Sequence, residues 1–320
     1  MSETVTTLSR FHLGEQALQS ETGKLDKIER ASRTMIRDYM PEQHRDFFAG
    51  LRYLFIGTVD QQSQPWSSIL AGPTGFVTTP DAHTMHIDLT HVGSSILAEP
   101  AFAEVDVGST VGVLGLDLSN RRRNRMHGRV TQITPDRLVI RVSQSFGNCP
   151  KYINTRTIDD SLPLPSLGET FERDDLSDAD RLRITRVDTF FIASHHQDGS
   201  GADYEGADVS HRGGASGFVH IEDDNSLTIP DYMGNYMFNT LGNLLLDPKT
   251  GLLFIDFDNG DLMQINGKAE IIRDANEVAS YPGAHRLLRI HVDYVRYTPG
   301  GLPLRWQFLE PSPYSPVIAN

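Results

Sequence analysis

The sequence predicts a mainly β protein, with two small barrels or sandwiches in tandem behind a helical extension. Three observations predict this. Short apolar runs bounded by turn residues start at Tyr53 and recur along the rest of the chain. A segment rich in Pro, Asp and Ser, residues 159–183, separates two groups of these runs. The length of 320 residues allows about two domains.

The helical extension comes first. Between residues 14 and 50, apolar side chains recur at a loose three-to-four spacing, which is typical of helices. Pro41 interrupts the pattern, and residues 42–51 are expected to form a further helix behind this proline. We therefore assign residues 1–45 to a helical extension.

The strands are expected in two groups. The first group comprises residues 53–59, 67–70, 75–78, 84–89, 111–117, 125–133 and 138–146. The second comprises residues 189–194, 217–221, 226–230, 251–256, 262–272 and 288–297. The predicted domains follow these groups: a first barrel at 46–155, a linker at 156–185, a second barrel at 186–310 and a tail at 311–320.

The two groups also match each other in sequence. Residues 72–77 (GPTGFV) match residues 214–219 (GASGFV) at an offset of 142, and Ser68 then falls on Ser210. Residues 111–117 match 250–256 at an offset of 139, which places Gly128 on Gly267. Two unrelated small β domains can share apolar patterns. Because glycine and proline positions coincide as well, we interpret the chain as a duplication.

Composition and motifs exclude several classes of function. With 29 basic and 42 acidic residues, the net charge is −13, which disfavours nucleic-acid or anionic-membrane binding. A single cysteine, no visible secretory signal and no long apolar run lead us to expect a cytoplasmic protein. Fingerprints of Rossmann enzymes, P-loop NTPases, α/β-hydrolases and zincins are missing.

The densest group of polar residues lies at 208–214 (DVSHRGG). Its candidate ligand-binding residues are Ser210, His211, Arg212, Gly213 and Gly214. Paired glycines let a backbone approach a ligand closely, and an arginine can hold a phosphate or place charge beside an electron-accepting ring. The alternative is a glycine turn with a surface arginine.

A second polar group lies between a strand and a predicted helix, at residues 230–243. Asp231, Asn235, Asn239 and Thr240 provide polar groups where the helix begins, a position that suits an anionic oxygen. Three aromatic residues of the same segment offer flat faces for a ring. Ordinary helix capping and core packing are the alternative explanation.

The third group is the basic strand at 121–129 (RRRNRMHGR). Strand alternation places Arg123, Arg125, His127 and Arg129 on one face, and Gln264 takes the equivalent place in the second repeat. A cationic cluster in an acidic protein suits a phosphate dianion. An edge strand made positive to prevent aggregation is the alternative.

Two other features are weaker. His195, His196 and His211 have no compact metal-ligand spacing, so no metal site is predicted. Cys149 precedes Pro150, a residue common at the first position of a helix, and a helix N-terminus lowers the pKa of a thiol. A small capping residue is the simpler interpretation of this cysteine.

The second repeat resembles the flavin-binding split barrels of the pyridoxamine 5′-phosphate oxidase family. The resemblance is carried by the strand order after Gly217, by Asp247-Pro248 followed by Gly-Leu-Leu-Phe, and by residues 263–270 (MQINGKAE). The first repeat is similar to a diverged copy. The resemblance implies six-stranded Greek-key barrels that bind FMN at a two-barrel interface, which a tandem chain could form within itself.

Carried over by position, the phosphate-binding turn of the family falls on Asn239 and Thr240. The family has basic residues at this turn and this chain has none, so the phosphate would need Arg212 or the strand at 123–129. The oxidase's substrate motif, an Arg-Leu-His after glycines, is also missing; residues 300–306 (GGLPLRW) stand in its place.

The expected function is that of an FMN-dependent oxidoreductase acting on a small molecule. Its expected partners are the substrate and an electron donor, NAD(P)H or a reductase, with a homodimer as one assembly. The alternative is a non-catalytic module that binds flavin, heme or a deazaflavin, and the third hypothesis is a ligand-free structural duplicate. The main flavin site is expected around the second repeat, since the first repeat lacks the counterparts of His211 and Arg212.

Overall fold

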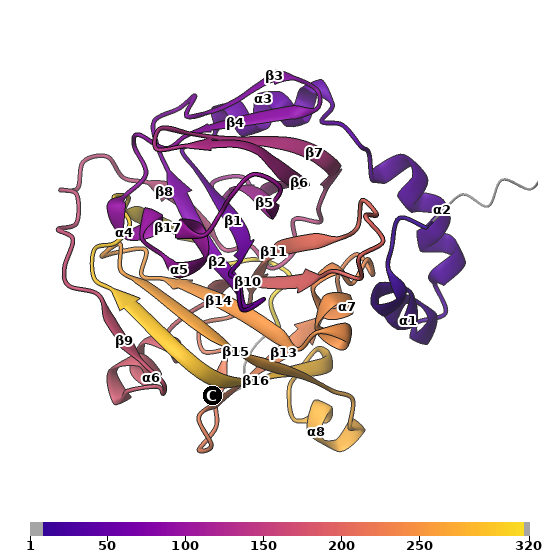
Figure 1. Cartoon of the computed structure of the whole chain (residues 1–320). Coiled ribbons are helices and arrows are strands. Elements are labelled where there is room, and N and C mark those ends of the chain that lie inside the picture. The colour runs from indigo at the N-terminus through magenta and orange to yellow at the C-terminus, as the bar shows by residue number, and fades with distance from the viewer. Residues whose placement is uncertain (1–8, 317–320) are drawn as a thin grey trace, which may run out of the picture.

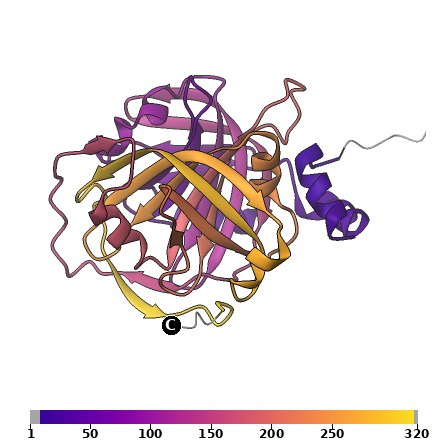
Figure 2. The ribbon, with the colours of Figure 1, turned by 90° about the horizontal axis from the view of Figure 1, so that it is seen from below.

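The computed structural model describes residues 9–316, and its N-terminal part is helical (Figure 1). The helices are α1 (Leu13–Glu21), α2 (Leu25–Met35) and α3 (Glu42–Gly50). His12 caps α1, with the side chain of Glu15 reaching back to the His12 N–H, and Pro41 precedes α3 as expected. Seen from below, α1 and α2 stand out from the rounded body of the molecule (Figure 2).

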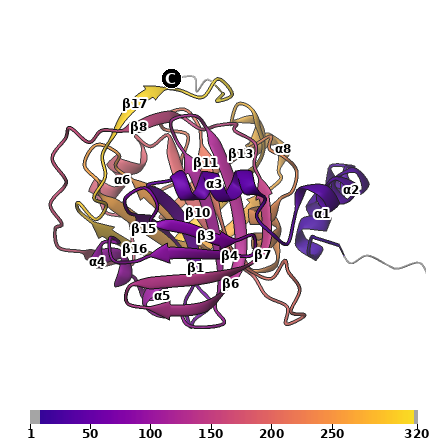
Figure 3. The ribbon, with the colours of Figure 1, turned by 90° about the horizontal axis from the view of Figure 1, so that it is seen from above.

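The first sheet has seven strands. In chain order they are β1 (Tyr53–Val59), β2 (Pro65–Ala71), β3 (Val77–Asp81), β4 (Thr84–Asp88), β5 (Thr110–Asp117), β6 (Arg122–Thr134) and β7 (Arg137–Gly147). Their order in the sheet is β2-β1-β5-β6-β7-β4-β3, with antiparallel pairing throughout. Helix α3 packs against β3 and crosses this sheet in the view from above (Figure 3). The short helices α4 (Ser94–Leu97) and α5 (Pro100–Ala103) connect β4 to β5.

The second sheet repeats the same topology. Its strands are β10 (Thr189–His196), β11 (Gly206–Gly213), β12 (His220–Ile221), β13 (Ser226–Tyr232), β14 (Lys249–Ile255), β15 (Leu262–Ile272) and β16 (Ala284–Thr298). Their order is β11-β10-β14-β15-β16-β13-β12. Helix α7 (Asn239–Leu246) connects β13 to β14, and α8 (Ala275–Ala279) connects β15 to β16.

Glycines occupy equivalent places in both sheets. A side chain at Gly72 would meet the ring of Phe76, and one at Gly214 would meet the ring of Phe218. Gly128 follows an irregularity in the pairing of β6 with β7, as Gly267 does in the pairing of β15 with β16. The equivalences that the sequence predicted at offsets 142 and 139 are therefore also equivalences of position in the fold.

The two sheets pack on each other in a reciprocal way. Strand β11 packs against β1 and β5, while β2 packs against β10 and β14. At the centre, the rings of the equivalent residues Phe55 and Phe191 stack with their centroids 3.5 Å apart. The middle of this contact is apolar, and the first hydrophobic core continues into Phe191, Val209 and Leu253.

Two segments differ from expectation. Residues 206–213 form strand β11, paired along its length with β10, where the sequence suggested a loop. The predicted linker contains β9 (Phe171–Arg173), which pairs with β16, and α6 (Asp178–Ile184). The small sheet of β8 (Thr155–Ile158) and β17 (Trp306–Glu310) joins the segment after the first sheet to the end of the chain. No helix among the described residues is long and apolar enough to cross a membrane.

Candidate functional site

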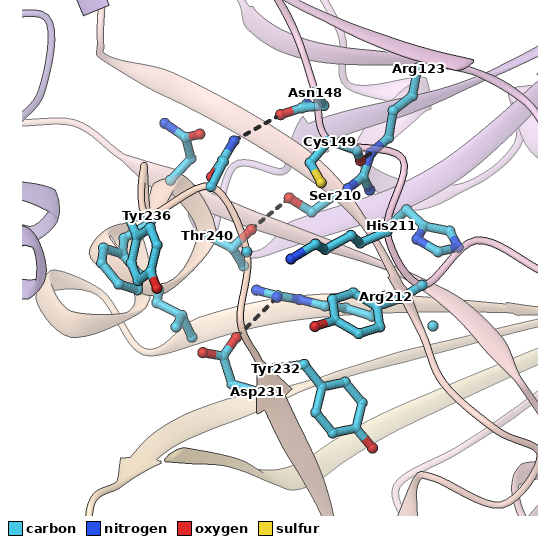
Figure 4. A pocket seen from close by; sticks show the side chains of 18 of the residues that line it. Arg123, Asn148, Cys149, Ser210, His211, Arg212, Asp231, Tyr232, Tyr236 and Thr240 are labelled. Atoms are coloured by element: carbon cyan, nitrogen blue, oxygen red, sulfur yellow. Dashed lines mark hydrogen bonds and ion pairs between the residues drawn. The ribbon is translucent and has the colours of Figure 1, made fainter. Parts of the chain in front are cut away.

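A pocket lies where β6 of the first sheet meets β11, β13 and α7 of the second (Figure 4). It holds about 880 Å³ of empty space, including its open mouth. Figure 4 shows Arg123 and Cys149 at one end and Asp231 and Tyr232 at the other. Its walls carry four cationic side chains and five Phe or Tyr side chains, namely Arg123, Arg125, Lys151, Arg212, Tyr152, Phe218, Tyr232, Tyr236 and Phe238.

Asp208 is the centre of the polar network behind this pocket. Its carboxylate is 3.0 Å from Nη1 of Arg125 and 3.1 Å from Nε2 of His127, both on the strand of the other sheet. Thr240 Oγ1 donates to the same carboxylate at 3.2 Å. Burial opposes ionisation of Asp208, but Arg125 and His127 outweigh it and hold the pKa of this carboxyl well below its ordinary value. The pair is therefore ionised and ties the two sheets together.

Ser210 and Thr240 continue this network toward the start of α7. Their hydroxyl groups are 2.7 Å apart, and Arg125 also donates to Ser210 Oγ. Arg125 Nη1 also donates to the side-chain oxygen of Asn239, at the start of α7, at 3.3 Å. The residues that the sequence placed in separate motifs on β6, β11 and α7 thus form one connected site.

Arg212 is held at the other side of the pocket by Asp231. Its Nη1 is 3.1 Å from the Asp231 carboxylate, whose other oxygen lies 3.5 Å from Nε of Arg286. Burial raises the pKa of Asp231, and the two arginines oppose this effect. Arg286 also lies over the ring of Phe238, with 4.8 Å between its guanidinium carbon and the ring centroid.

Several donors facing this region lack a partner among the described residues. The buried Nε atoms of Arg125 and Arg212 and Nε2 of His211 make no hydrogen bond. Nε of Arg123 donates to the Cys149 carbonyl at 2.6 Å, and no carboxylate is paired with this arginine in the described part of the chain. Burial, reinforced by Arg125, lowers the pKa of Arg123 to about 9. Buried polar atoms without partners carry a desolvation cost, which a bound ligand would remove.

His211 is uncharged at neutral pH. It is 5% exposed, and burial together with Arg123, Arg156 and Arg212 holds its pKa well below its ordinary value. A neutral imidazole next to the pocket can donate or accept one hydrogen bond without adding charge.

The N-terminal extension supports the site from behind. Helix α1 packs against α7, and a side chain at Gly14 would collide with the backbone of Gly242. Glu15, on α1, is buried and accepts a hydrogen bond from the side chain of Asn239. Burial raises the pKa of Glu15 to about 8, so its carboxyl group is largely protonated at pH 7.

Nine of the twelve residues expected to bind a ligand line this pocket. They are Ser210, His211, Arg212, Gly213, Asp231, Asn235, Asn239, Thr240 and Arg125. The other three lie elsewhere. Arg129 is in the middle of β6, 3.6 Å from Glu205; Gln264 contacts the backbone of Ser67 at 3.0 Å; and the carbonyl of Gly214 accepts from Asn154.

The segment after β7 supplies pocket residues that the sequence did not identify. Asn148, Lys151 and Tyr152 line the wall together with Cys149. Cys149 does not begin a helix, because residues 151 and 152 form a turn, so the expected helix N-terminus is wrong. The sequence signal that could have identified these pocket residues was a lysine followed by a tyrosine, close to the basic strand. Among the described residues, no cluster of three or more metal-ligating side chains occurs.

The equivalent place in the first sheet is filled by the chain itself. Ser68, the counterpart of Ser210, donates to the buried carboxyl group of Glu99. Gln264 replaces Arg125, and Arg296 donates to it at 3.4 Å. Burial raises the pKa of Glu99 to about 7.

Part of the chain is similar to known proteins. Residues 176–299 match the family model described as pyridoxamine 5′-phosphate oxidase. No curated protein matches the sequence. Similar solved structures include a variant of HupZ from Group A Streptococcus, with 10% identity, a TM-score of 0.30, and coverage of 38% of this chain and 98% of its own.

Two further structures are similar over one part of the chain. A putative pyridoxamine 5′-phosphate oxidase from Lactobacillus delbrueckii has 16% identity and a TM-score of 0.29, covering 38% of this chain and 93% of its own. An FAD-binding protein from Mesorhizobium loti has 12% identity and a TM-score of 0.26, covering 40% and 97%. Likenesses this distant do not bear on activity. The match over residues 176–299 covers strands β10 to β16 and helix α7, and this part of the chain is similar to the pyridoxamine 5′-phosphate oxidase family.

Proposed function

We propose that the protein binds FMN in the pocket between β6, β11 and α7 and acts as an oxidoreductase on a small molecule. The observation that carries the proposal is the combination of unpaired cationic donors with aromatic walls in one pocket. A phosphate dianion needs charge-assisted donors, and a flat ring system needs apolar faces. The family match supports a flavin rather than another flat anion.

The residues divide into two roles under this proposal. Arg123 is the first candidate for the phosphate, because Asp208 already neutralises Arg125 and Asp231 neutralises Arg212. Lys151 adds a second cation to the same pocket. His211 and Arg212 are the candidates for the ring, where a neutral donor and a positive charge adjust electron affinity. Flavin, when bound, supplies the redox chemistry, while the protein orients it and sets its electrostatic surroundings.

We propose further that the chain carries one flavin site. Leu70 of the first sheet is the counterpart of Arg212 in the second sheet. Gln264 is the counterpart of Arg125 in the equivalent site. Glu99 and Ser68 fill the space with a buried hydrogen bond. A negative or acidic group at this place would repel a phosphate. The first sheet then contributes β6 to the working site and is otherwise a scaffold.

The remaining expectations form part of this proposal. We place the protein in the cytoplasm, with a small-molecule substrate and either NAD(P)H or a reductase as electron donor. The domain boundaries at residues 45, 155, 185 and 310 separate the extension, the two barrels, the linker and the tail. A homodimer is not required for the site, since one chain provides both of its walls.

The test compares FMN with riboflavin, which lacks the phosphate. Arg123→Gln should weaken FMN binding by about ten- to a hundredfold, the loss expected for one charge-assisted hydrogen bond, and should change riboflavin binding less than twofold. Arg129→Gln, on the same strand but outside the pocket, is the matched control and should change neither. Equal losses for both ligands would mean that Arg123 acts through folding, and FMN binding unaffected by Arg123→Gln would overturn the phosphate assignment.

A second measurement separates an enzyme from a binding module. FMN-loaded protein that is bleached by NAD(P)H and recovers its colour with turnover of an acceptor behaves as an oxidoreductase. Loaded protein that is bleached only by a chemical reductant behaves as a carrier or sensor. If the protein binds neither FMN nor riboflavin, the proposed function is wrong.

A further inference from the structure

A shallow groove adjoins the pocket where the α2–α3 connection meets the ends of β6 and β7. Four arginines line it, Arg37, Arg121, Arg122 and Arg123, and no carboxylate of the described residues does. In a chain with a net charge of −13, a surface with this composition is unusual. The groove shares Arg123, Asn148, Cys149 and Asn235 with the pocket, so the two are continuous.

The arginines of the groove differ in whether a carboxylate balances their charge. Arg121 is 2.8 Å from the carboxylate of Glu310, so its charge is already balanced. Arg122 donates to the Gln43 carbonyl at 2.6 Å and lies over the Phe47 ring, and neither contact neutralises it. Arg37 has no ion-pair partner among the described residues.

The backbone fixes Arg37 beside the groove. Its N–H donates to the Ser145 carbonyl at 3.1 Å, and the Ser145 N–H donates to the Arg37 carbonyl at 2.7 Å. The positive charge of the groove also acts on His44. Burial, and after it Arg37 and Arg122, lowers the pKa of His44 to about 4. The positive field is therefore a fixed property of the folded chain.

Amide donors without partners face the same groove. Nδ2 of Asn124 and Nδ2 of Asn148 are buried and make no hydrogen bond within the described part of the chain. Asn124 is only 5% exposed, so the donors at the surface of the groove are mainly the arginine N–H groups. A surface of free N–H donors with positive charge and no carboxylate matches the acceptor oxygens of phosphate groups.

We propose that this arginine groove binds the phosphate groups of a second, nucleotide-like ligand that reaches the flavin pocket along it. The inference rests on the proposed function, because it takes the adjoining pocket as the flavin site. A nucleotide pyrophosphate carries acceptor oxygens on adjacent phosphates, which can engage Arg37 and Arg122 together. One end of such a ligand then lies at the shared wall of Asn148 and Cys149, next to the ring site.

The experiment uses FMN-saturated full-length protein, with ADP as the probe and adenosine as its uncharged counterpart. ADP should bind with an affinity that falls as salt rises, and adenosine should not bind measurably. Arg37→Gln and Arg122→Gln should each weaken ADP binding by about tenfold while leaving FMN affinity unchanged. Arg141→Gln, an exposed arginine of β7 outside the groove, is the matched control.

Each outcome of this experiment either supports or overturns the assignment of the arginine groove. Absence of ADP binding, or equal losses in Arg141→Gln and Arg122→Gln, overturns the inference. If polyglutamate binds and ADP does not, the groove is a docking surface for an acidic protein and the inference is equally wrong. If FMN fails to bind but ADP binding still depends on Arg37 and Arg122, the proposed function fails and the groove stands as an independent phosphate site.

Discussion

Glu15 makes the stability of this protein depend on pH in an uncommon direction. The side chain is buried at the contact of α1 with α7, where it accepts from the His12 N–H at 2.9 Å and from the side chain of Asn239. Its folded pKa is about 8, because burial disfavours the carboxylate, against 4.5 in an exposed state. Glu15→Gln keeps the size of the side chain and removes its ionisation.

The magnitude follows from linkage. A group whose pKa is raised by folding contributes fully below the unfolded pKa and loses that contribution as pH rises toward the folded value. Each pH unit between 4.5 and 8 therefore costs the wild type about 1.4 kcal/mol relative to Glu15→Gln. Between pH 5.5 and 7.5 the difference in unfolding free energy should change by about 2.5 kcal/mol in favour of the variant.

Urea unfolding of both proteins at several pH values measures this difference. Only its slope with pH is diagnostic, because the glutamine amide cannot accept both hydrogen bonds that Glu15 accepts, which adds a constant cost to the variant. His44 is unaffected by the substitution, and the folded pKa of His12, which lies 3.4 Å from Glu15, is about 4 and therefore below the pH range of the comparison. A difference that stays constant between pH 5.5 and 7.5 would refute the reasoning.

Three further predictions follow from packing and from the asymmetry of the two sheets. Phe191→Ala breaks the central ring stack and should lower the unfolding free energy by about 3–5 kcal/mol in a denaturant titration. Gly14→Val should detach α1 from α7, seen as faster proteolysis of the N-terminal extension while the rest of the chain stays protected. Arg212→Ala should weaken flavin binding or shift its reduction potential, whereas Leu70→Ala should change only stability; the opposite result would invert the assignment of the two sites.

The repeated β architecture could be predicted from the sequence because it depends on local signals. Gly72 and Gly214 pack against Phe76 and Phe218 in the two sheets. This need for a glycine does not depend on the residues at the surface. Strand β11 was missed for a physical reason. Asp208, Ser210 and Arg212 look like loop residues, but the face that carries them is buried against the other sheet, and this contact lies far away in sequence.

The same limit applies to the basic strand. Alternation placed Arg123, Arg125 and Arg129 on one face, which says nothing about where along that face a ligand lies. Six residues of a strand span about 20 Å, so Arg123 and Arg129 cannot serve one phosphate. Ion pairs distinguish these arginines: Asp208 pairs with Arg125 and Glu205 with Arg129, whereas Arg123 has no carboxylate partner among the described residues. No local pattern could reveal these pairings, or the docking of Glu15 onto α7.

Joining both barrels in one chain explains why the two equivalent sites differ. In a symmetric pair of identical chains, a substitution that closes one site closes the other as well. Here the counterparts of Arg125 and Arg212 are Gln264 and Leu70. A change at these two positions does not alter the residues that line the second-sheet pocket. The first-sheet site contains the buried Ser68–Glu99 hydrogen bond, and the second-sheet pocket contains Nε atoms of Arg125 and Arg212 without partners among the described residues. The second-sheet pocket keeps Arg125 and Arg212 where the other site has Gln264 and Leu70, and this difference in charge is the reason why we place the proposed function there.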